Sequence, residues 1–139
     1  MRTIAATAIM LLSFMGLANA AESYCSAGSF VTVYDGADTG TTWTVSALGV
    51  RKIQIAGNTK PSRGCIFGFR AVGRTIRNEF VERPKLGVAR FPNRTTLYYE
   101  SAKAGEDNIA YRVFWEEWGS GKIVSAVIRL KIKVVNGPV

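Results

Sequence analysis

The residues that could carry chemistry in this chain are few, and the commonest catalytic base is missing. The sequence contains no histidine, so Ser–His and Cys–His nucleophile pairs cannot form. Two carboxylates stand side by side at Glu116 and Glu117. Neighbours on a strand point to opposite faces, so these two are poorly placed to act on one substrate. No glycine-rich phosphate loop leads into a helical pattern. We therefore expect a non-catalytic protein without a cofactor.

The clearest candidate for binding is the aromatic run Phe114–Trp118, which reads FWEEW. If Trp115 faces inward on a strand, then Phe114, Glu116 and Trp118 lie on the outer face. An exposed Phe and Trp beside a carboxylate could stack on a sugar ring or anchor a protein partner. The alternative is that Trp118 only covers the open end of the fold.

Basic residues form the second set of candidates. The chain has 18 Lys and Arg against 10 Asp and Glu, and residues 51–94 hold eleven of these cations against two acids. Arg129, Lys131 and Lys133 alternate along the last predicted strand, about 6.7 Å apart. Such a row could follow the charges of a polyanion, or it could protect an edge strand or favour solubility. The candidate residues of this basic surface are Arg70, Arg74, Arg77, Arg129, Lys131 and Lys133.

Oxygen ligands for calcium are present at two places, Asp35–Asp38 and Glu106-Asp107. Neither has the ligand density of a calcium-binding loop. Asp and Gly are ordinary turn residues, so we interpret both places as turns and predict no metal site.

The first twenty residues have the three-part layout of a secretory signal peptide. A positive start at Met1-Arg2 precedes the apolar stretch Ile4–Leu17, and Ala18-Asn19-Ala20 is a small-x-small cleavage site. The stretch is too short to be a membrane span. The sequence thus predicts a periplasmic or secreted protein whose single domain covers residues 21–139.

Two cysteines, Cys25 and Cys65, follow the predicted signal. An even count in an exported protein favours a disulfide, and only one pairing exists. They lack CxxC spacing and the chain lacks histidine, which argues against a metal site.

Short runs of β-branched and aromatic residues, separated by Gly, Asn, Asp and Pro, predict an all-β domain. The range Thr75–Val81 is open between a strand and a connection, and the residues Lys60–Gly64 are predicted as a loop. The other predicted strands are Ser29–Tyr34, Thr42–Leu48, Lys52–Ala56, Cys65–Phe69, Gly87–Phe91, Thr95–Tyr99, Ile109–Trp118 and Lys122–Val135.

The last two predicted strands carry the strongest pattern. Gly119-Ser120-Gly121 joins them as a hairpin turn in which glycines supply positive φ. The final strand alternates strictly, with apolar residues on one face and cations on the other, as in an antiparallel sheet packed on a core. The apolar set is Ile128, Leu130, Ile132 and Val134.

The C-terminal half resembles the Ig-like and cadherin-like repeats of bacterial surface proteins. The shared layout is a Pro-x-x-Gly turn, a Tyr-rich strand, Gly-x-Asp before a Tyr-x-Val strand, a glycine turn and an alternating last strand. These features lie at Arg83–Val88, Leu97–Tyr99, Gly105–Val113, Gly121 and Ala126–Val134. The resemblance implies an Ig-like sandwich, and its motifs are structural.

Asp107 lies four residues before Tyr111, which is the spacing around the tyrosine corner of immunoglobulin-type domains. The resemblance implies that the Tyr111 hydroxyl bonds to backbone at the connection between the sheets. Val113 falls where those domains often place a cysteine. A Cys25–Cys65 disulfide would instead tie the N-terminal segment to a strand.

We therefore predict a signal peptide over residues 1–20 and one two-sheet, Ig-like β-sandwich of about seven or eight antiparallel strands over 21–139. The expected function is binding of anionic envelope or surface polymers through the basic face. The alternative is a protein-partner module, an inhibitor or accessory subunit, that binds through the Trp115–Trp118 hairpin tip. Nucleic acid is not an expected partner, because no groove-reading helix is visible. The oligomeric state stays open.

Overall fold

Ten strands and no helix make up the described part of the chain. The computed structural model describes residues 25–26, 30–47, 50–55 and 58–139, and only the backbone of residues 50–55 and 58–63. The predicted signal peptide, residues 1–20, lies outside these ranges. The strands are β1 (Phe30–Val33), β2 (Asp38–Ser46), β3 (Val50–Ile55), β4 (Asn58–Arg63), β5 (Cys65–Ala71), β6 (Gly73–Glu82), β7 (Val88–Asn93), β8 (Thr96–Glu100), β9 (Gly105–Glu117) and β10 (Ile123–Val135).

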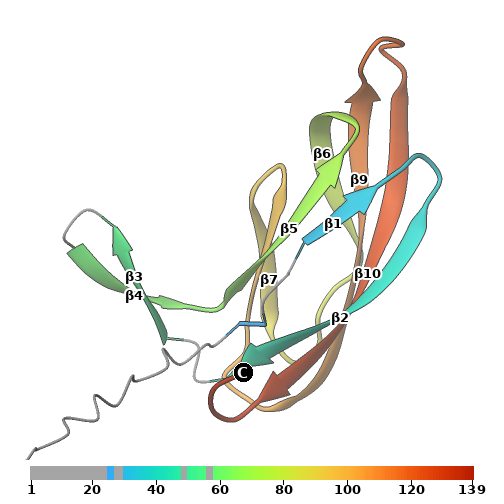
Figure 1. The fold of residues 1–139 in the computed structure, drawn as a ribbon. Helices are drawn as coiled ribbons and strands as arrows, with labels where there is room; N and C mark the ends of the chain where they lie inside the picture. Colours follow the sequence, from blue (N-terminus) through green and yellow to red (C-terminus); the bar gives the residue numbers. More distant parts are fainter. Residues whose placement is uncertain (1–24, 27–29, 48–49, 56–57) are drawn as a thin grey trace, which may run out of the picture.

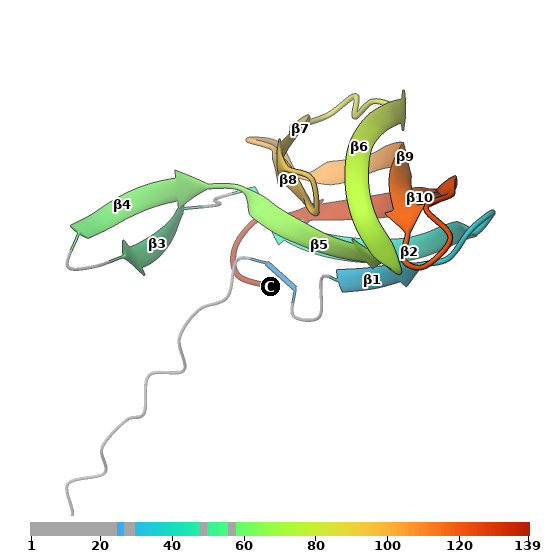
Figure 2. The ribbon, with the colours of Figure 1, turned by 90° about the horizontal axis from the view of Figure 1, so that it is seen from above.

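Eight of these strands form two four-stranded sheets that pack face to face, which confirms the predicted two-sheet β-sandwich (Figures 1 and 2). One sheet has the order β1-β5-β8-β7 and the other the order β2-β10-β9-β6. Strands β5, β8 and β7 occupy the places of B, E and D in an immunoglobulin sandwich, and β6, β9 and β10 those of C, F and G.

Two pairings are parallel, so the prediction of purely antiparallel strands is wrong at the N-terminal end. Strand β1 runs parallel to β5, and β2 runs parallel to β10. A tight turn joins β1 to β2, closed by a 3.0 Å hydrogen bond that the Ala37 N–H donates to the Tyr34 carbonyl. Because the chain changes sheets at this turn, each strand joins the edge of a different sheet instead of pairing with the other.

Strands β3 and β4 pair with each other in a hairpin that extends away from the sandwich in both views. The predicted loop over Lys60–Gly64 is therefore wrong for most of its length. Pro61 stands opposite Lys52 in this ladder. Proline is tolerated in a strand that has only one neighbour, because no second ladder needs its missing N–H.

Strands β9 and β10 form the longest hairpin, as their alternation predicts. Gly119 and Gly121 in its turn have φ values of 91° and 66°, which confirms the predicted need for glycine. The inward residues of β10 are buried and the three cations between them are exposed. The range Thr75–Val81, left open above, lies within strand β6.

Aromatic side chains fill the core between the two sheets. The ring of Trp43 on β2 lies 5.5 Å from that of Phe67 on β5, measured between ring centroids. Tyr111 on β9 lies 5.2 Å from Phe69 and 5.3 Å from Phe91 of the opposite sheet. These contacts hold the sheets together and leave the strand ends and outer faces as the available surface.

The predicted disulfide between Cys25 and Cys65 is present, with their Cα atoms 5.8 Å apart. Cys25 also forms an antiparallel bridge with Val45 of β2. Cys65 opens β5 in the other sheet. The bond therefore ties the N-terminal segment, which is bridged to the edge strand β2 of one sheet, to the start of the inner strand β5 of the other.

Replacing both Cys25 and Cys65 with alanine should lower the free energy of unfolding by about 4 kcal/mol, because the closed loop spans 40 residues. Urea unfolding followed by tryptophan fluorescence measures this change, since Trp43 and Trp115 are buried. A loss below about 1 kcal/mol would contradict the loop-closure account.

Candidate functional site

The outer end of the β9–β10 hairpin gathers the most exposed apolar side chains near one another. We define the hairpin tip as Val72, Arg74, Glu116, Trp118 and Ile123. Trp118 is 75% exposed and Ile123 is 64% exposed. Glu116 stands in register between Ile123 of β10 and Arg74 of β6. The tip therefore combines apolar and charged groups across three strands.

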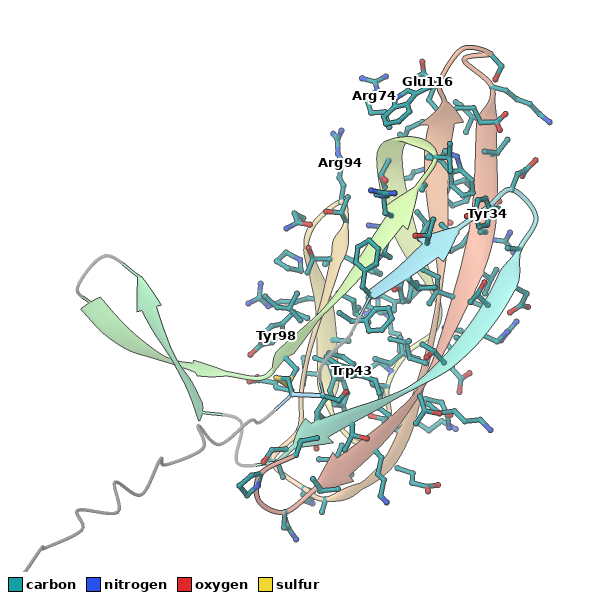
Figure 3. The ribbon with its side chains drawn as sticks, in the orientation of Figure 1. Tyr34, Trp43, Arg74, Arg94, Tyr98 and Glu116 are labelled. Atoms are coloured by element: carbon teal, nitrogen blue, oxygen red, sulfur yellow. A yellow bond between two sulfur atoms is a disulfide. The ribbon has the colours of Figure 1, made fainter. Side chains whose placement is uncertain are left out.

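Alternation along β9 produces this arrangement. Trp115 is buried as predicted, and Trp118 is exposed on the outside. Phe114 is half-buried because the guanidinium of Arg77 lies 3.7 Å from its ring centroid. Arg74 Nη2 donates a 2.8 Å hydrogen bond to Glu116 Oε2, and both side chains point outward at this end of the molecule (Figure 3).

Gly73 brings the neighbouring β5–β6 turn close to the tip. A Cβ at this position would collide with the backbone carbonyl of Glu116 and with the Trp115 ring. Gly73 pairs with Glu117, and the exposed residues Val72 and Trp118 each lie one position beyond this last pair. Two loops thus form one end surface.

The basic row on β10 is exposed as predicted, but its charge is partly neutralised. Arg129 Nε donates hydrogen bonds of 2.8 and 3.1 Å to the two carboxylate oxygens of Asp38, and these bonds raise the pKa of the guanidinium. Lys133 stands opposite Glu106 in the β9–β10 register, whereas Lys131 stands opposite Asn108. The outer face of this sheet therefore carries both positive and negative charges.

The interpretation of this row as protection for an edge strand is wrong. Strand β10 lies between β2 and β9, so neither of its backbone edges is open. Position in a sheet depends on pairing between distant segments, and the local alternation does not contain that information.

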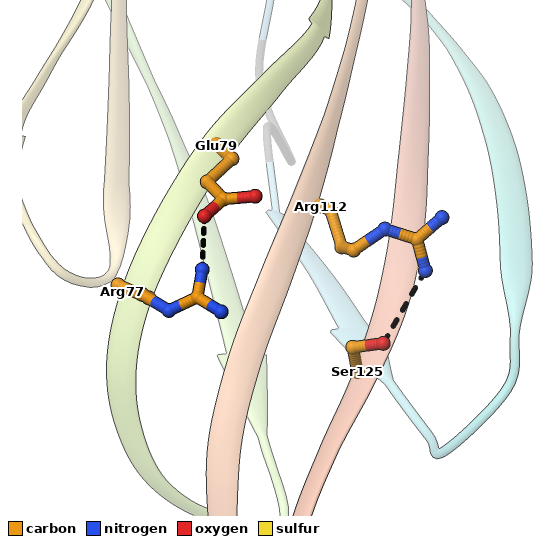
Figure 4. Close-up of polar contacts among 4 residues, drawn as sticks. All are labelled: Arg77, Glu79, Arg112 and Ser125. Atoms are coloured by element: carbon orange, nitrogen blue, oxygen red, sulfur yellow. Dashed lines mark hydrogen bonds and ion pairs between the residues drawn. The ribbon is translucent and has the colours of Figure 1, made fainter.

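The predicted cluster of Arg70, Arg74 and Arg77 does not form. Arg70 lies on β5 in one sheet, and the other two lie on β6 in the second sheet. Arg77 also bonds to Glu79, and nearby Arg112 Nη1 donates a 3.3 Å hydrogen bond to Ser125 Oγ (Figure 4). The cations on the outside of β6 and β9 thus have partners of their own.

Asp107 is a buried carboxylate with an unusual number of donors. The backbone N–H groups of Lys85, Leu86 and Gly87 donate hydrogen bonds of 2.8, 3.0 and 2.9 Å to it. The Tyr99 hydroxyl donates another of 2.9 Å from the opposite sheet. Burial acts to raise the pKa of Asp107, but these donors together hold it below its usual value.

This network corrects two predictions. Asp107 lies within strand β9, so Glu106-Asp107 is not a turn. Tyr111 is buried, but its hydroxyl has no hydrogen-bond partner among the described residues, and burial raises its pKa. The polar link between the sheets is made by Tyr99 instead, and its acceptor is the Asp107 carboxylate, not backbone. The feature of the sequence that relates to this network is the Pro-x-x-Gly turn, because three of its backbone N–H groups donate to Asp107.

The sequence pattern did not identify one further surface, the outer face of the β1-β5-β8-β7 sheet. Phe30 and Ile66 are exposed there, and Arg90 lies over the ring of Tyr98. The alternation of Cys65–Ala71 predicts this outward face, but it gives no indication of what lies beside it.

The described residues contain no group of three or more His, Cys, Asp or Glu side chains able to hold a metal ion. A search of the same residues finds no helix long and apolar enough to span a membrane.

No family model, no curated protein and no solved structure matches this chain.

Asp107→Asn should lower the free energy of unfolding at pH 7 by about 2–4 kcal/mol, because it replaces a buried acceptor of several N–H bonds. The folded-state pKa of Asp107 is lowered, so its contribution is complete above pH ~4 and is lost at lower pH. Urea unfolding across pH 2–7 should show the difference from wild type shrinking below pH ~4.

The matched control is Asp35→Asn, which changes an exposed turn carboxylate. Equal losses of unfolding free energy in the two variants would contradict this account. So would a difference between Asp107→Asn and wild type that does not depend on pH, because the charge of the Asp107 carboxylate would then not contribute to stability.

Proposed function

We propose that this protein is a non-catalytic binding module that engages a protein partner through the hairpin tip. The observation that carries the proposal is the 75% exposure of Trp118 at the end of the longest hairpin. Tryptophan is the residue type most enriched among the side chains that dominate protein–protein affinity.

The composition of the tip supports a protein partner. Ile123 and Val72 provide aliphatic surface beside the indole, and the Arg74–Glu116 pair provides a polar rim. Apolar anchors within a polar rim are the usual anatomy of a protein interface. The alternative, in which Trp118 covers the end of the sandwich, has little support because most of its surface is open.

Binding of anionic polymers through the basic face remains a prediction, with less support. Arg74, Arg77 and Arg129 each contact a carboxylate. A polyanion would have to compete with these internal partners, and its gain from counterion release would be smaller.

We further propose that the protein acts in the periplasm or outside the cell. The predicted signal peptide supports export, and the Cys25–Cys65 disulfide is compatible with an oxidising compartment.

Trp118→Ala should weaken binding of the partner more than tenfold while leaving the fold intact, because the side chain makes little contact with its own protein. The measurement is retention of envelope-extract proteins on immobilised wild type and variant, eluted along a salt gradient. An aromatic anchor predicts one discrete protein that stays bound at high salt on the wild type and is missing on Trp118→Ala.

The matched control is Val81→Ser, which changes another exposed apolar residue on β6, away from the tip. Equal retention on all three proteins would contradict the proposal. Polyanionic material that elutes early, and whose retention requires Lys131 and Lys133, would favour binding of anionic polymers instead.

A further inference from the structure

A second surface, separate from the hairpin tip, lies on the outside of the β1-β5-β8-β7 sheet. We define the β5 face as Phe30, Ile66, Arg70, Arg90 and Tyr98. The pairing register places Ile66 beside Tyr98, and Tyr98 beside Arg90, in one row across three strands. Phe30 stands opposite Gly68 on the neighbouring strand, and Arg70 follows two residues later.

The β5 face exposes apolar surface that nothing in the described chain covers. Phe30 is 56% exposed and Ile66 is 54% exposed, on adjacent strands. Gly68, which pairs with Phe30, carries no side chain. Single exposed apolar residues are ordinary, but neighbouring ones on a sheet face mark an interaction surface.

The cations of the β5 face differ from those of the opposite sheet. Arg74, Arg77 and Arg129 each contact a carboxylate. Among the described residues, neither Arg70 nor Arg90 has a carboxylate within salt-bridge distance. Glu100, two residues after Tyr98 on β8, accepts a 2.9 Å hydrogen bond from the Tyr98 hydroxyl. Arg70 and Arg90 therefore carry positive charge that no described carboxylate pairs.

The geometry disfavours two other occupants. The guanidinium of Arg90 lies 4.5 Å from the Tyr98 ring centroid, so this ring face is covered and cannot stack on a sugar. Ile66 is aliphatic, so Phe30 is the one residue of the β5 face that offers an open ring, and a single ring is a weak platform for a sugar. A second copy docked face to face would bring four arginines into one interface, and like charges repel.

We infer that the β5 face binds an extended, acidic and apolar segment of a partner protein. Its apolar side chains would contact Phe30 and Ile66, and its carboxylates would pair with Arg70 and Arg90. These arginines are two strands and about four residues apart, roughly 16 Å between their backbone positions. Carboxylates four to six residues apart on an extended segment, roughly 13–20 Å, match this separation.

The test uses the purified protein and a fluorescein-labelled twelve-residue peptide of alternating aspartate and leucine. Fluorescence anisotropy should show binding that weakens at least tenfold in the variant Arg70→Ser/Arg90→Ser. The matched control, Lys131→Ser/Lys133→Ser, removes the same charge from the other sheet and should change the Kd less than twofold. Ile66→Ser should also weaken binding. Circular dichroism confirms that each variant is folded.

Several outcomes would overturn the inference. Equal loss in the two double variants would show that only net charge matters. Equal affinity for a serine–leucine peptide would show simple apolar adhesion. Tighter binding of polygalacturonate, lost in Arg70→Ser/Arg90→Ser, would assign the surface to an acidic polysaccharide. Trp118→Ala should leave peptide binding unchanged, so failure here is distinguishable from failure at the hairpin tip.

Discussion

The carboxylate of Asp107 is the polar interaction on which the rest of the sandwich depends. It lies on β9 in one sheet and accepts a hydrogen bond from Tyr99 on β8 in the other. The same carboxylate accepts three backbone N–H bonds from the β6–β7 connection, where the chain crosses between the sheets. Charge-assisted bonds of this kind are stronger than neutral ones, and their loss would leave several buried donors unpaired. One side chain thus fixes both a crossing connection and the alignment of the layers.

The contacts that stabilise the fold lie between the two sheets, so the ends and outer faces of the sandwich are available for binding. Strands β9 and β10 have 13 residues each, longer than their neighbours. Their inward residues are buried in the core as far as Trp115 and Val124. Trp118, in the turn beyond, is exposed to solvent. The β5 face is open for a different reason, because no strand or loop of the described chain packs over it. Rigid strands that present exposed side chains are well suited to recognition.

The sequence predicted those features that depend on local pattern. The alternation of β10, the glycines of its hairpin turn and the inward placement of Trp115 are confirmed, as is the Cys25–Cys65 disulfide. Features that depend on distant pairing were missed. Arg129 contacts Asp38 across 91 residues of sequence, and β10 became central only because β2 joined its free edge. Asp107 looked like a turn residue because its donors come from about twenty residues earlier.

The central claim is that Trp118 at the hairpin tip is the main contact with a partner protein. The most direct measurement places the photo-crosslinking residue p-benzoylphenylalanine at position 118 and, as a control, at the exposed position of Val81. After illumination of cells that produce each protein, adducts are separated by mass. Our account predicts one discrete protein adduct at position 118 and none of the same mass at position 81. The same adducts at both positions, or none at position 118, would contradict it.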